Sequence, residues 1–516
     1  MNSDSTSSGH GLPAATPLFT RLTVSLLLLF SLIIIAERTL LPVPPLGRDP
    51  AAYALISREL LDGKALYEDV WDHKPPAIFV VYGAMVSMFG TSERAFFGLN
   101  VVVTLISLLG IFFAGGLGPG QRSAAVIAAA FWAVLSGNLF LEGRDPNADM
   151  FLNACLIWAM AALIWRPGPR IGTRAAFAAG LCFAIGTLFK PVLLASAAFL
   201  ALAYIVAGLY GGVRARHLLA DCAMMAAVGA LAWFAVVAYF AASGRLDVFV
   251  ASVFSYNGYY SGDVISNILA LVNGRGELFI DFLGPLPLLM AAGIAVTFFY
   301  DLRKALLILA LAVSSWVAIA LPGQFYTHYY QLWFPPIVIA TAWALGFLAR
   351  SEKALVRGTA YVAGVFALGL AIWVNVPSYQ AILAEDWKAS TDRPMLLGEE
   401  VAERVNFLLE PGETFFVWGD IPNLYLLAER RPPAAVVFER HLAGGPMAER
   451  LKLRVAEDLA RERPEILVWQ TNRRPVSHWV MADFDPTAIA TVGDAFEIFT
   501  RRGGRLEQKL RSENER

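Results

Sequence analysis

Long apolar stretches recur over residues 1–375 of this chain and are separated by short polar segments. A helix that crosses a membrane needs roughly 20 mostly apolar residues, because the hydrocarbon core is about 30 Å thick. We predict eleven such spans, at residues 20–36, 95–117, 123–141, 150–165, 175–189, 191–210, 219–242, 281–300, 303–321, 331–349 and 358–375. The fold class that follows is mainly α, a polytopic bundle of transmembrane helices.

A twelfth apolar run, Ala77–Phe89, is only 13 residues long. That length is short for a span and suits a helix lying at the membrane interface. If this run crossed the membrane, residues 37–76 would lie on the cytoplasmic side. If it does not cross, the whole first loop, 37–94, faces outward and the N-terminus is cytoplasmic. Arg21, beside the first span, favours the second arrangement.

Lysine and arginine residues concentrate in alternate loops, and such loops face the cytoplasm. The opposite loops, 142–149, 243–280 and 322–330, are poor in basic residues and are predicted to face outward. The polar tail, 376–516, lies on that same side. Within it, Glu413–Trp418 and Glu465–Trp469 have the apolar composition of short buried strands, and Ala448–Arg463 has the spacing of an amphipathic helix. We therefore predict two domains, a membrane bundle over 1–375 and an extracytoplasmic α/β domain over 376–516.

Composition agrees with a membrane protein. Hydrophobic residues make up 57% of the chain and charged residues 16%, against about 45–50% and about 25% in ordinary soluble domains. These values exclude a disordered or collagen-like chain. The net charge of -1 suggests no nucleic-acid partner. The three cysteines all lie in apolar stretches, so no disulfide framework or cysteine-type zinc site is expected.

Charged residues are costly near hydrocarbon, so those that remain there tend to pair, line cavities or act chemically. Asp49 follows the first span and precedes a helix-like stretch, Ala51–Leu61. It is either the N-cap of that helix or a catalytic carboxylate. Lys74 follows Asp72 just before the short apolar run. It either anchors that helix as a snorkelling lysine or binds an anionic headgroup such as a lipid phosphate.

The turn over residues 142–149 carries four charges between two spans. Asp149 would lie at or inside the next span, where a carboxylate needs a partner. Its candidate partners are Arg144, Lys74 or a divalent cation. With Glu142 or Asp145, Asp149 could hold Mg²⁺ or Mn²⁺.

Two further outward-facing places carry polar side chains. Lys190 lies between two closely spaced apolar segments, where it could do no more than separate one membrane span from the next. His328 and Tyr329 lie in a polar, aromatic turn. Such aromatics commonly mark the membrane interface, but they could also contact phosphate or sugar. If all five places share one cavity, its carboxylates can activate a hydroxyl and its cations can bind a phosphate leaving group. That combination indicates group transfer from a lipid phosphate.

An ordered set of segments then resembles the polytopic GT-C glycosyltransferases, in particular glycosyltransferase family 39, the aminoarabinose transferase of lipid A and the rhizobial galacturonosyltransferases. The matching segments are Arg48–Tyr53, Gly63–Tyr67, Trp71–Pro76, Gly143–Asp149, Phe189–Pro191, His328–Tyr330 and Val417–Gly419. The resemblance covers nearly the whole chain. It departs from the protein mannosyltransferases at Pro50, which stands where those enzymes have a second acid, and this weakens protein O-mannosylation as the activity.

The resemblance implies an inverting sugar transfer from a polyprenyl-phosphate donor to a lipid, glycan or protein acceptor at the periplasmic face of the inner membrane. It implies that Asp49 is the base for the acceptor hydroxyl and that Lys74 binds the carrier phosphate. Asp149 matches a second acid that positions acceptor or metal. Further substrate-binding residues are expected within the same segments: Tyr53, Asp72, Arg144, Lys190, His328 and Tyr329.

Two other functions compete with this interpretation. A transporter or flippase of lipid-linked sugars is the first, but the chain shows no inverted repeat and its charges cluster at one face instead of the membrane midplane. The second is a membrane scaffold whose tail does the work, through residues such as Trp418, Asp420 and His441. Since no metal or nucleophile spacing occurs there, we expect those three to be core packing and solvated surface.

Overall fold

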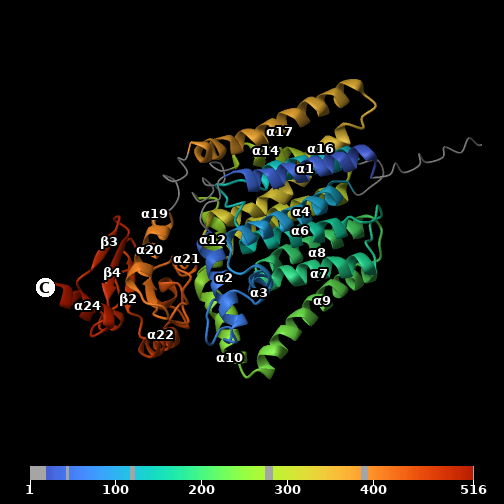
Figure 1. Ribbon diagram of the computed structural model, residues 1–516. Coiled ribbons are helices and arrows are strands. Elements are labelled where there is room, and N and C mark those ends of the chain that lie inside the picture. Colours follow the sequence, from blue (N-terminus) through green and yellow to red (C-terminus); the bar gives the residue numbers. More distant parts are fainter. Residues whose placement is uncertain (1–18, 42–45, 117–121, 274–282, 385–392, 515–516) are drawn as a thin grey trace, which may run out of the picture.

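The computed structural model describes residues 19–41, 46–116, 122–273, 283–384 and 393–514. The chain is mainly helical and ends in a domain with a small β-sheet, as predicted (Figure 1). The helices of the bundle are α1 (Arg21–Leu40), α4 (Glu93–Gly116), α5 (Arg122–Leu135), α6 (Ala148–Leu163), α7 (Thr173–Phe189), α8 (Leu193–Tyr210), α9 (Ala215–Ala242), α14 (Leu286–Tyr300), α15 (Leu302–Ala320), α16 (Phe334–Leu348) and α17 (Ala354–Leu383).

Each of the eleven predicted spans coincides with one of these helices. Seven helices among the described residues are long and apolar enough to cross a membrane. The other four, α5, α6, α7 and α14, are shorter and pack among the long ones. The protein is therefore a multi-pass membrane protein. The first residues of the predicted span 281–300 lie outside the described ranges.

Two predicted spans were wrong at their ends: α17 runs on to Leu383 instead of ending at residue 375, and α5 ends early. The helix expected over 123–141 stops at Leu135, and residues 136–147 form a chain of turns. Gly137 follows directly on the end of the helix, and Gly143 and Pro146 lie further along the turns, although the apolar residues Leu139–Leu141 continue the hydrophobic pattern. Because α5 ends at Leu135, the charged turn before α6 lies at the end of the bundle.

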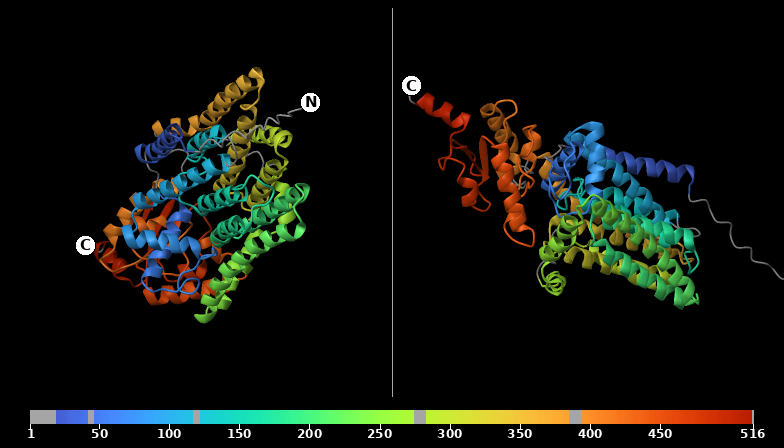
Figure 2. Two further views of the ribbon diagram at one scale, coloured as in Figure 1. Left: turned by 90° about the vertical axis from the view of Figure 1, so that its right-hand side faces the viewer. Right: turned by 90° about the horizontal axis from the view of Figure 1, so that it is seen from below.

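Short helices cover the end of the bundle that faces the tail (Figures 1 and 2). They are α2 (Arg48–Leu61), α3 (Ala77–Phe89), α10 (Leu246–Val250), the π-helix η1 (Ala251–Ser255), α11 (Tyr256–Ser261), α12 (Val264–Ala270) and the 3-10 helix η2 (Thr327–Trp333). Helix α3 has the bounds expected of the short apolar run, and it packs on α2.

The tail is built around a four-stranded sheet with strand order β1-β2-β4-β3. Strand β1 (Phe415–Trp418) pairs parallel with β2 (Ile466–Gln470), whereas β4 (Phe496–Thr500) is antiparallel to both β2 and β3 (Ala490–Val492). The tail helices are α19 (Arg393–Leu396), α20 (Gly398–Leu408), α21 (Asn423–Leu427), the 3-10 helix η3 (Glu439–Leu442), α22 (Ala448–Glu462), α23 (His478–Met481) and α24 (Arg505–Asn514). The two predicted strands and the predicted helix Ala448–Arg463 are confirmed.

Direct contacts join the tail to the first loop of the bundle. The backbone nitrogen of Trp71 donates a hydrogen bond to the carbonyl of Ala435 at 2.9 Å, and Arg454 pairs with Asp69 at 3.0 Å. The tail therefore covers the end of the bundle at which the charged turns lie.

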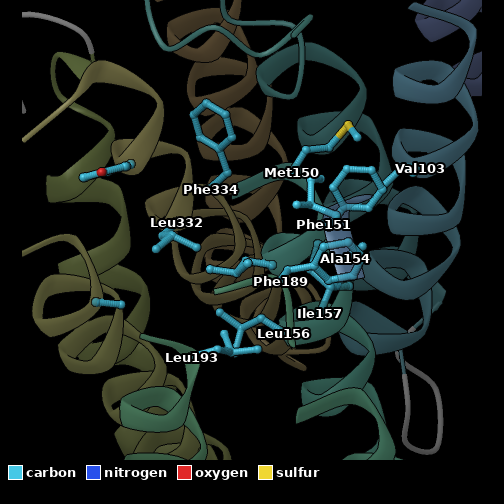
Figure 3. Packing of buried hydrophobic residues seen from close by; sticks show 14 of the residues in the cluster. Val103, Met150, Phe151, Ala154, Leu156, Ile157, Phe189, Leu193, Leu332 and Phe334 are labelled. Atoms are coloured by element: carbon cyan, nitrogen blue, oxygen red, sulfur yellow. The ribbon is translucent and has the colours of Figure 1, made fainter. Parts of the chain in front are cut away.

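Buried apolar side chains of α6, α7 and their neighbours pack together inside the bundle (Figure 3). Phe151, in the first turns of α6, stacks on Phe189 at the end of α7 with ring centroids 4.7 Å apart. Asp149 and Lys190 each lie close in sequence to one of these two rings. The stacked pair thus holds the start of α6 against the end of α7, and the two charged residues are brought together above it.

Close helix packing leads to a stability prediction. In α7, a Cβ added to Gly180 would lie 2.8 Å from the Cα of Met225 in α9, which is backbone that cannot rotate away. We expect Gly180→Ala to lower the free energy of unfolding by about 1–3 kcal/mol, the usual effect of overpacking. Thermal unfolding in detergent measures this. Gly229→Ala in α9 is the control, since open space surrounds that position, and an equal loss there would contradict the prediction.

Candidate active site

A cavity of about 380 Å³ lies at the end of the bundle that faces the tail. Its wall is drawn from both ends of the sequence, because the start of α2, the turns before α3, α6 and α8, the helix η2 and the tail helix η3 all meet there. Seven of the predicted site residues line it: Asp49, Tyr53, Lys74, Asp149, Lys190, His328 and Tyr329.

Asp49 lies in the first turn of α2, but it is not the N-cap, which is Gly47. The Asp49 carboxylate instead accepts hydrogen bonds at Oδ2 from Lys74 Nζ and from the Tyr53 hydroxyl, both at 3.1 Å. Tyr53 is one helical turn further along α2, so the same face of the helix presents both groups. The capping alternative for Asp49 is therefore wrong, since the side chain points to the cavity.

Two cations flank the Asp49 carboxylate. Lys74 binds Oδ2, and the guanidinium of Arg440 lies 3.8 Å from Oδ1. Burial alone would raise the pKa of Asp49, but Lys74 and then Arg440 outweigh it and hold this pKa well below its usual value. Burial likewise opposes the charge on Lys74, yet Asp49 and Asp72 keep the pKa of the Lys74 ammonium above its usual value. Carboxylate and ammonium are both charged in the cavity.

Asp72 supports Lys74 from outside the cavity lining. Its carboxylate accepts a hydrogen bond from the Lys74 backbone nitrogen at 3.0 Å and lies 3.3 Å from Nδ1 of His73. Asp72 thus shapes the turn that carries Lys74, and we expect it to act on substrate only through that lysine.

Asp149 and Lys190 form a second ion pair in the cavity. The Lys190 ammonium donates to both carboxylate oxygens of Asp149, at 3.1 and 3.0 Å. The same ammonium lies 3.6 Å from the centroid of the Tyr329 ring, a cation–π contact. His328 Nε2 is 3.8 Å from the Asp149 carboxylate. The partner of Asp149 is therefore Lys190, which was not among the three partners expected from the sequence.

The charged turn before α6 points its side chains in different directions. Glu142 accepts hydrogen bonds from Thr327 at 2.6 Å and pairs with His328 Nδ1 at 3.0 Å. Arg144 is buried outside the cavity, where its guanidinium donates to the carbonyl of Arg38 at 3.1 Å. The structure does not bring Arg144 together with the cavity residues, because the turn directs this side chain toward the end of α1.

The candidate metal ligands Glu142, Asp145 and Asp149 do not converge. Glu142 faces His328 and Asp149 faces Lys190, while Asp145 packs against Gly47. Within the described ranges, no group of three or more histidine, cysteine or acidic side chains is placed to hold a metal ion. We therefore derive no catalytic step through a metal ion.

Asp145 leads to a prediction about pH. Burial, and then the charge of Glu142, raises the pKa of Asp145 to about 8. In the unfolded chain the carboxyl ionises near about pH 4. Between these two values the folded protein holds a proton that the unfolded chain has lost, so stability falls as the pH rises through this window.

Asp145→Asn removes that proton and the pH dependence it causes. We expect the melting temperature of this variant to exceed that of the unchanged protein by a margin that grows from about pH 5 to about pH 8 and then levels off. Thermal unfolding in detergent over this range measures the margin. A margin that stays constant with pH would contradict the assignment.

The cavity also contains residues that sequence reasoning missed. Arg440, His73, Tyr260 and Tyr326 line it. Burial, followed by the charges of Lys74 and Arg440, holds the pKa of His73 well below its usual value, so this imidazole is neutral. His73 lies in Trp71–Pro76, one of the segments that resemble the GT-C glycosyltransferases, and could have been predicted as a site residue. Arg440 carries no signal in the sequence, because its role arises from contact between the two domains.

Asp420 and His441 also differ from expectation. Both are buried at the interface between tail and bundle instead of lying in a solvated surface. His441 Nδ1 is 2.7 Å from the hydroxyl of Tyr256 in α11. Trp418 is buried in the core, as expected.

Comparison with known proteins identifies the fold of this chain. No protein-family model matches the sequence, and no curated protein matches it. ArnT from Cupriavidus metallidurans in the apo state matches with a TM-score of 0.61 and 16% identity, over 93% of this chain and 98% of that chain. The same protein bound to undecaprenyl phosphate matches with a TM-score of 0.59.

A third structure is the archaeal oligosaccharyltransferase AglB from Archaeoglobus fulgidus, in complex with an inhibitory peptide and a dolichol-phosphate. It matches with a TM-score of 0.51 and 15% identity, over 87% of this chain and 69% of that chain. The chain has the GT-C fold. The GT-C resemblance seen in the sequence is thereby confirmed at the level of fold, and the GT-C fold accounts for the helical bundle capped by a C-terminal domain.

Proposed function

We propose that this protein is a membrane glycosyltransferase that moves a sugar from a polyprenyl-phosphate carrier to an envelope acceptor at the periplasmic face of the inner membrane. The observation that carries the proposal is the Asp49 carboxylate between two cations, Lys74 and Arg440, in the wall of the cavity. The GT-C fold supports it. So do two of the structural neighbours, which were solved with undecaprenyl phosphate and with a dolichol-phosphate.

The proposed reaction is a single displacement. The acceptor hydroxyl attacks the anomeric carbon, the bond from that carbon to the phosphate oxygen breaks, and the polyprenyl phosphate leaves with the electron pair. Asp49 takes the proton of the hydroxyl. Lys74 and Arg440 stabilise the charge that builds on the leaving phosphate. Because attack comes from the face opposite the phosphate, the anomeric configuration inverts.

The two cations also explain how a weakly basic carboxylate can act. Before substrate binds, Lys74 and Arg440 lower the basicity of Asp49. A donor phosphate between the same cations brings a negative charge close to Asp49 and shares their hydrogen bonds, so the pKa of Asp49 rises. The base becomes competent only when the leaving group is in place.

Asp149, Lys190, His328 and Tyr329 lie across the cavity and are proposed to bind the sugar and the acceptor. Ion pairs and aromatic rings offer the donors, acceptors and flat surfaces that sugars need. The orientation with a cytoplasmic N-terminus and a periplasmic tail belongs to the same proposal, since it puts the cavity on the face where the carrier-linked sugar is used.

Mass spectrometry of the envelope lipids, glycans and proteins, with and without this protein, tests the proposal. We expect one component to lack a sugar that returns with the unchanged protein and does not return with Asp49→Asn. An identical envelope profile would contradict glycosyl transfer. Saturable movement of a lipid-linked sugar across proteoliposomes, with no covalent product, would indicate a flippase instead.

A further inference from the structure

Tyr67 has a backbone conformation that a bulky residue rarely adopts. Its φ of 70° lies in the left-handed region, where the Cβ atom of an L-residue crowds the backbone carbonyl oxygen. The residue is buried and does not itself line the cavity. Such a conformation persists only where the surrounding contacts fix the residue, and it often marks a functional place. What the Tyr67 side chain contacts must therefore explain it.

The hydroxyl of Tyr67 reaches the residue that is expected to bind the donor phosphate. It donates a buried hydrogen bond of 2.7 Å to the backbone carbonyl of Lys74, seven positions further along the chain. The backbone nitrogen of Tyr67 donates to the carbonyl of Val70 at 2.7 Å, so the chain turns back at this point. The hydroxyl therefore closes a loop whose far end carries the lysine of the cavity.

The backbone of Lys74 is held on both sides. Its carbonyl accepts from Tyr67, and its nitrogen donates to Asp72 Oδ1 at 3.0 Å. Pro75 follows directly and restricts Lys74 to extended conformations. A lysine side chain is long and flexible, so a fixed backbone is what limits where the ammonium can lie. From this fixed point the ammonium meets Asp49 at 3.1 Å.

Two phenylalanine rings hold Tyr67 in turn. The centroid of its ring lies 5.4 Å from that of Phe240, near the end of α9, and 5.7 Å from that of Phe249 in α10. These two rings stack on each other with centroids 4.4 Å apart, and both are buried. Tyr67 thus attaches the loop that carries Lys74 to the helices of the bundle.

We propose that Tyr67 is a positioning residue, which fixes Lys74 in the place where this lysine binds the phosphate of the donor. The inference rests on the proposed function and deepens it, because it names what preorganises the phosphate site. Asp72 shapes the turn from within, whereas Tyr67 joins that turn to α9 and α10. The donor contacts Lys74, and Tyr67 acts only through that lysine.

Binding of a polyprenyl phosphate to the full-length protein in detergent tests this role. Tyr67→Phe removes one oxygen atom and keeps the aromatic contacts. We expect it to weaken binding about fivefold, the effect of one lost hydrogen bond, and to leave binding of the phosphate-free polyprenol unchanged. Lys74→Met should also weaken binding of the phosphate. Adding Tyr67→Phe to Lys74→Met should weaken it no further, because no ammonium is left to position.

The matched control is Tyr425→Phe in the tail. Tyr425 is buried as well, its hydroxyl accepts a hydrogen bond from the backbone nitrogen of Val417 at 2.9 Å, and it does not line the cavity. Both phenylalanine variants lose one buried hydrogen bond to the backbone, but only Tyr67→Phe should weaken binding of the phosphate. An unchanged affinity in Tyr67→Phe, an equal loss in Tyr425→Phe, or a further loss when Tyr67→Phe is added to Lys74→Met overturns the positioning role.

Transfer kinetics separate this role from the proposed function. We expect Tyr67→Phe to lower kcat/KM for the donor about fivefold and to leave the KM for the acceptor unchanged. A rise of the same size in the acceptor KM would mean that the whole cavity was disturbed, and it would overturn an effect confined to Lys74. Because the binding experiment needs no turnover, a protein that binds polyprenyl phosphate through Tyr67 and Lys74 but transfers no sugar would refute the proposed function and leave the positioning role standing.

Discussion

Asp49→Asn should reduce sugar transfer by about 100-fold to 10,000-fold, the contribution expected of a general base. Asparagine has nearly the shape of aspartate, but its amide cannot take the proton of the acceptor hydroxyl. The variant should still bind the donor at least as tightly, because Lys74 and Arg440 lose the carboxylate that now competes with the donor phosphate. Transfer of labelled sugar and binding of the donor, measured in the same membranes, report the two effects separately.

The matched control for Asp49→Asn is Asp247→Asn. Asp247 lies in the short helix α10 and pairs with Arg450, but both side chains are largely exposed, so this pair contributes little. We expect Asp247→Asn to transfer sugar at the unchanged rate. If Asp49→Asn kept transfer within about tenfold of the unchanged protein, the carboxylate would not be the base. A loss of donor binding together with transfer would mean that the cavity had collapsed.

Much of the bundle could be predicted because span length and hydrophobicity are local properties. Membrane thickness sets the length of an apolar run, so each predicted span coincides with a helix. The error at α5 has a local cause as well. Apolar residues continue past Leu135, but the backbone beyond it is turned by glycine and proline. Hydrophobicity alone does not report where a helix ends.

The cavity could be predicted in outline because charge near hydrocarbon is costly. The orientation predicted from the basic loops puts Asp49, Lys74 and Asp149 at one face of the membrane. The structure places all three in the wall of one cavity. Pairing within the cavity could not be predicted. Asp149 pairs with Lys190, while Arg144 of the same turn faces away from the cavity toward α1. A turn spreads neighbouring side chains in different directions, so closeness in sequence says little about contact.

The role of Arg440 in the cavity could not be predicted from the sequence. It lies in a four-residue 3-10 helix of the tail, with no motif around it. Its guanidinium becomes part of the cavity only because the tail packs on the first loop of the bundle. Contacts between distant segments of this kind depend on how two domains fit together, and a single sequence carries no record of that fit.

The second large effect is expected at the pair of Asp149 and Lys190. Both side chains are mostly removed from water, and the ammonium contacts both carboxylate oxygens. Removing one partner leaves the other as an uncompensated buried charge. Asp149→Asn and Lys190→Met should therefore each lower the free energy of unfolding by about 3–5 kcal/mol. Denaturant or thermal unfolding in detergent measures each loss.

The double variant, with Asp149→Asn and Lys190→Met together, carries no buried charge at this place. It should be more stable than either single variant, so the double-mutant cycle should give a coupling free energy larger than the loss in one single variant, about 3–5 kcal/mol or more. Strictly additive losses would show that the two side chains do not depend on each other in the folded protein.

Sugar transfer by the double variant separates scaffolding from a direct role. If the pair serves only to hold α6 against α7, a refolded double variant regains the transfer rate along with its stability. We expect stability to return without transfer, because the methionine that replaces Lys190 restores packing above the Tyr329 ring but supplies no cation and no hydrogen-bond donor to the cavity. Recovery of both would reduce Asp149 and Lys190 to structural residues and leave catalysis to the side of the cavity formed by Asp49, Lys74 and Arg440.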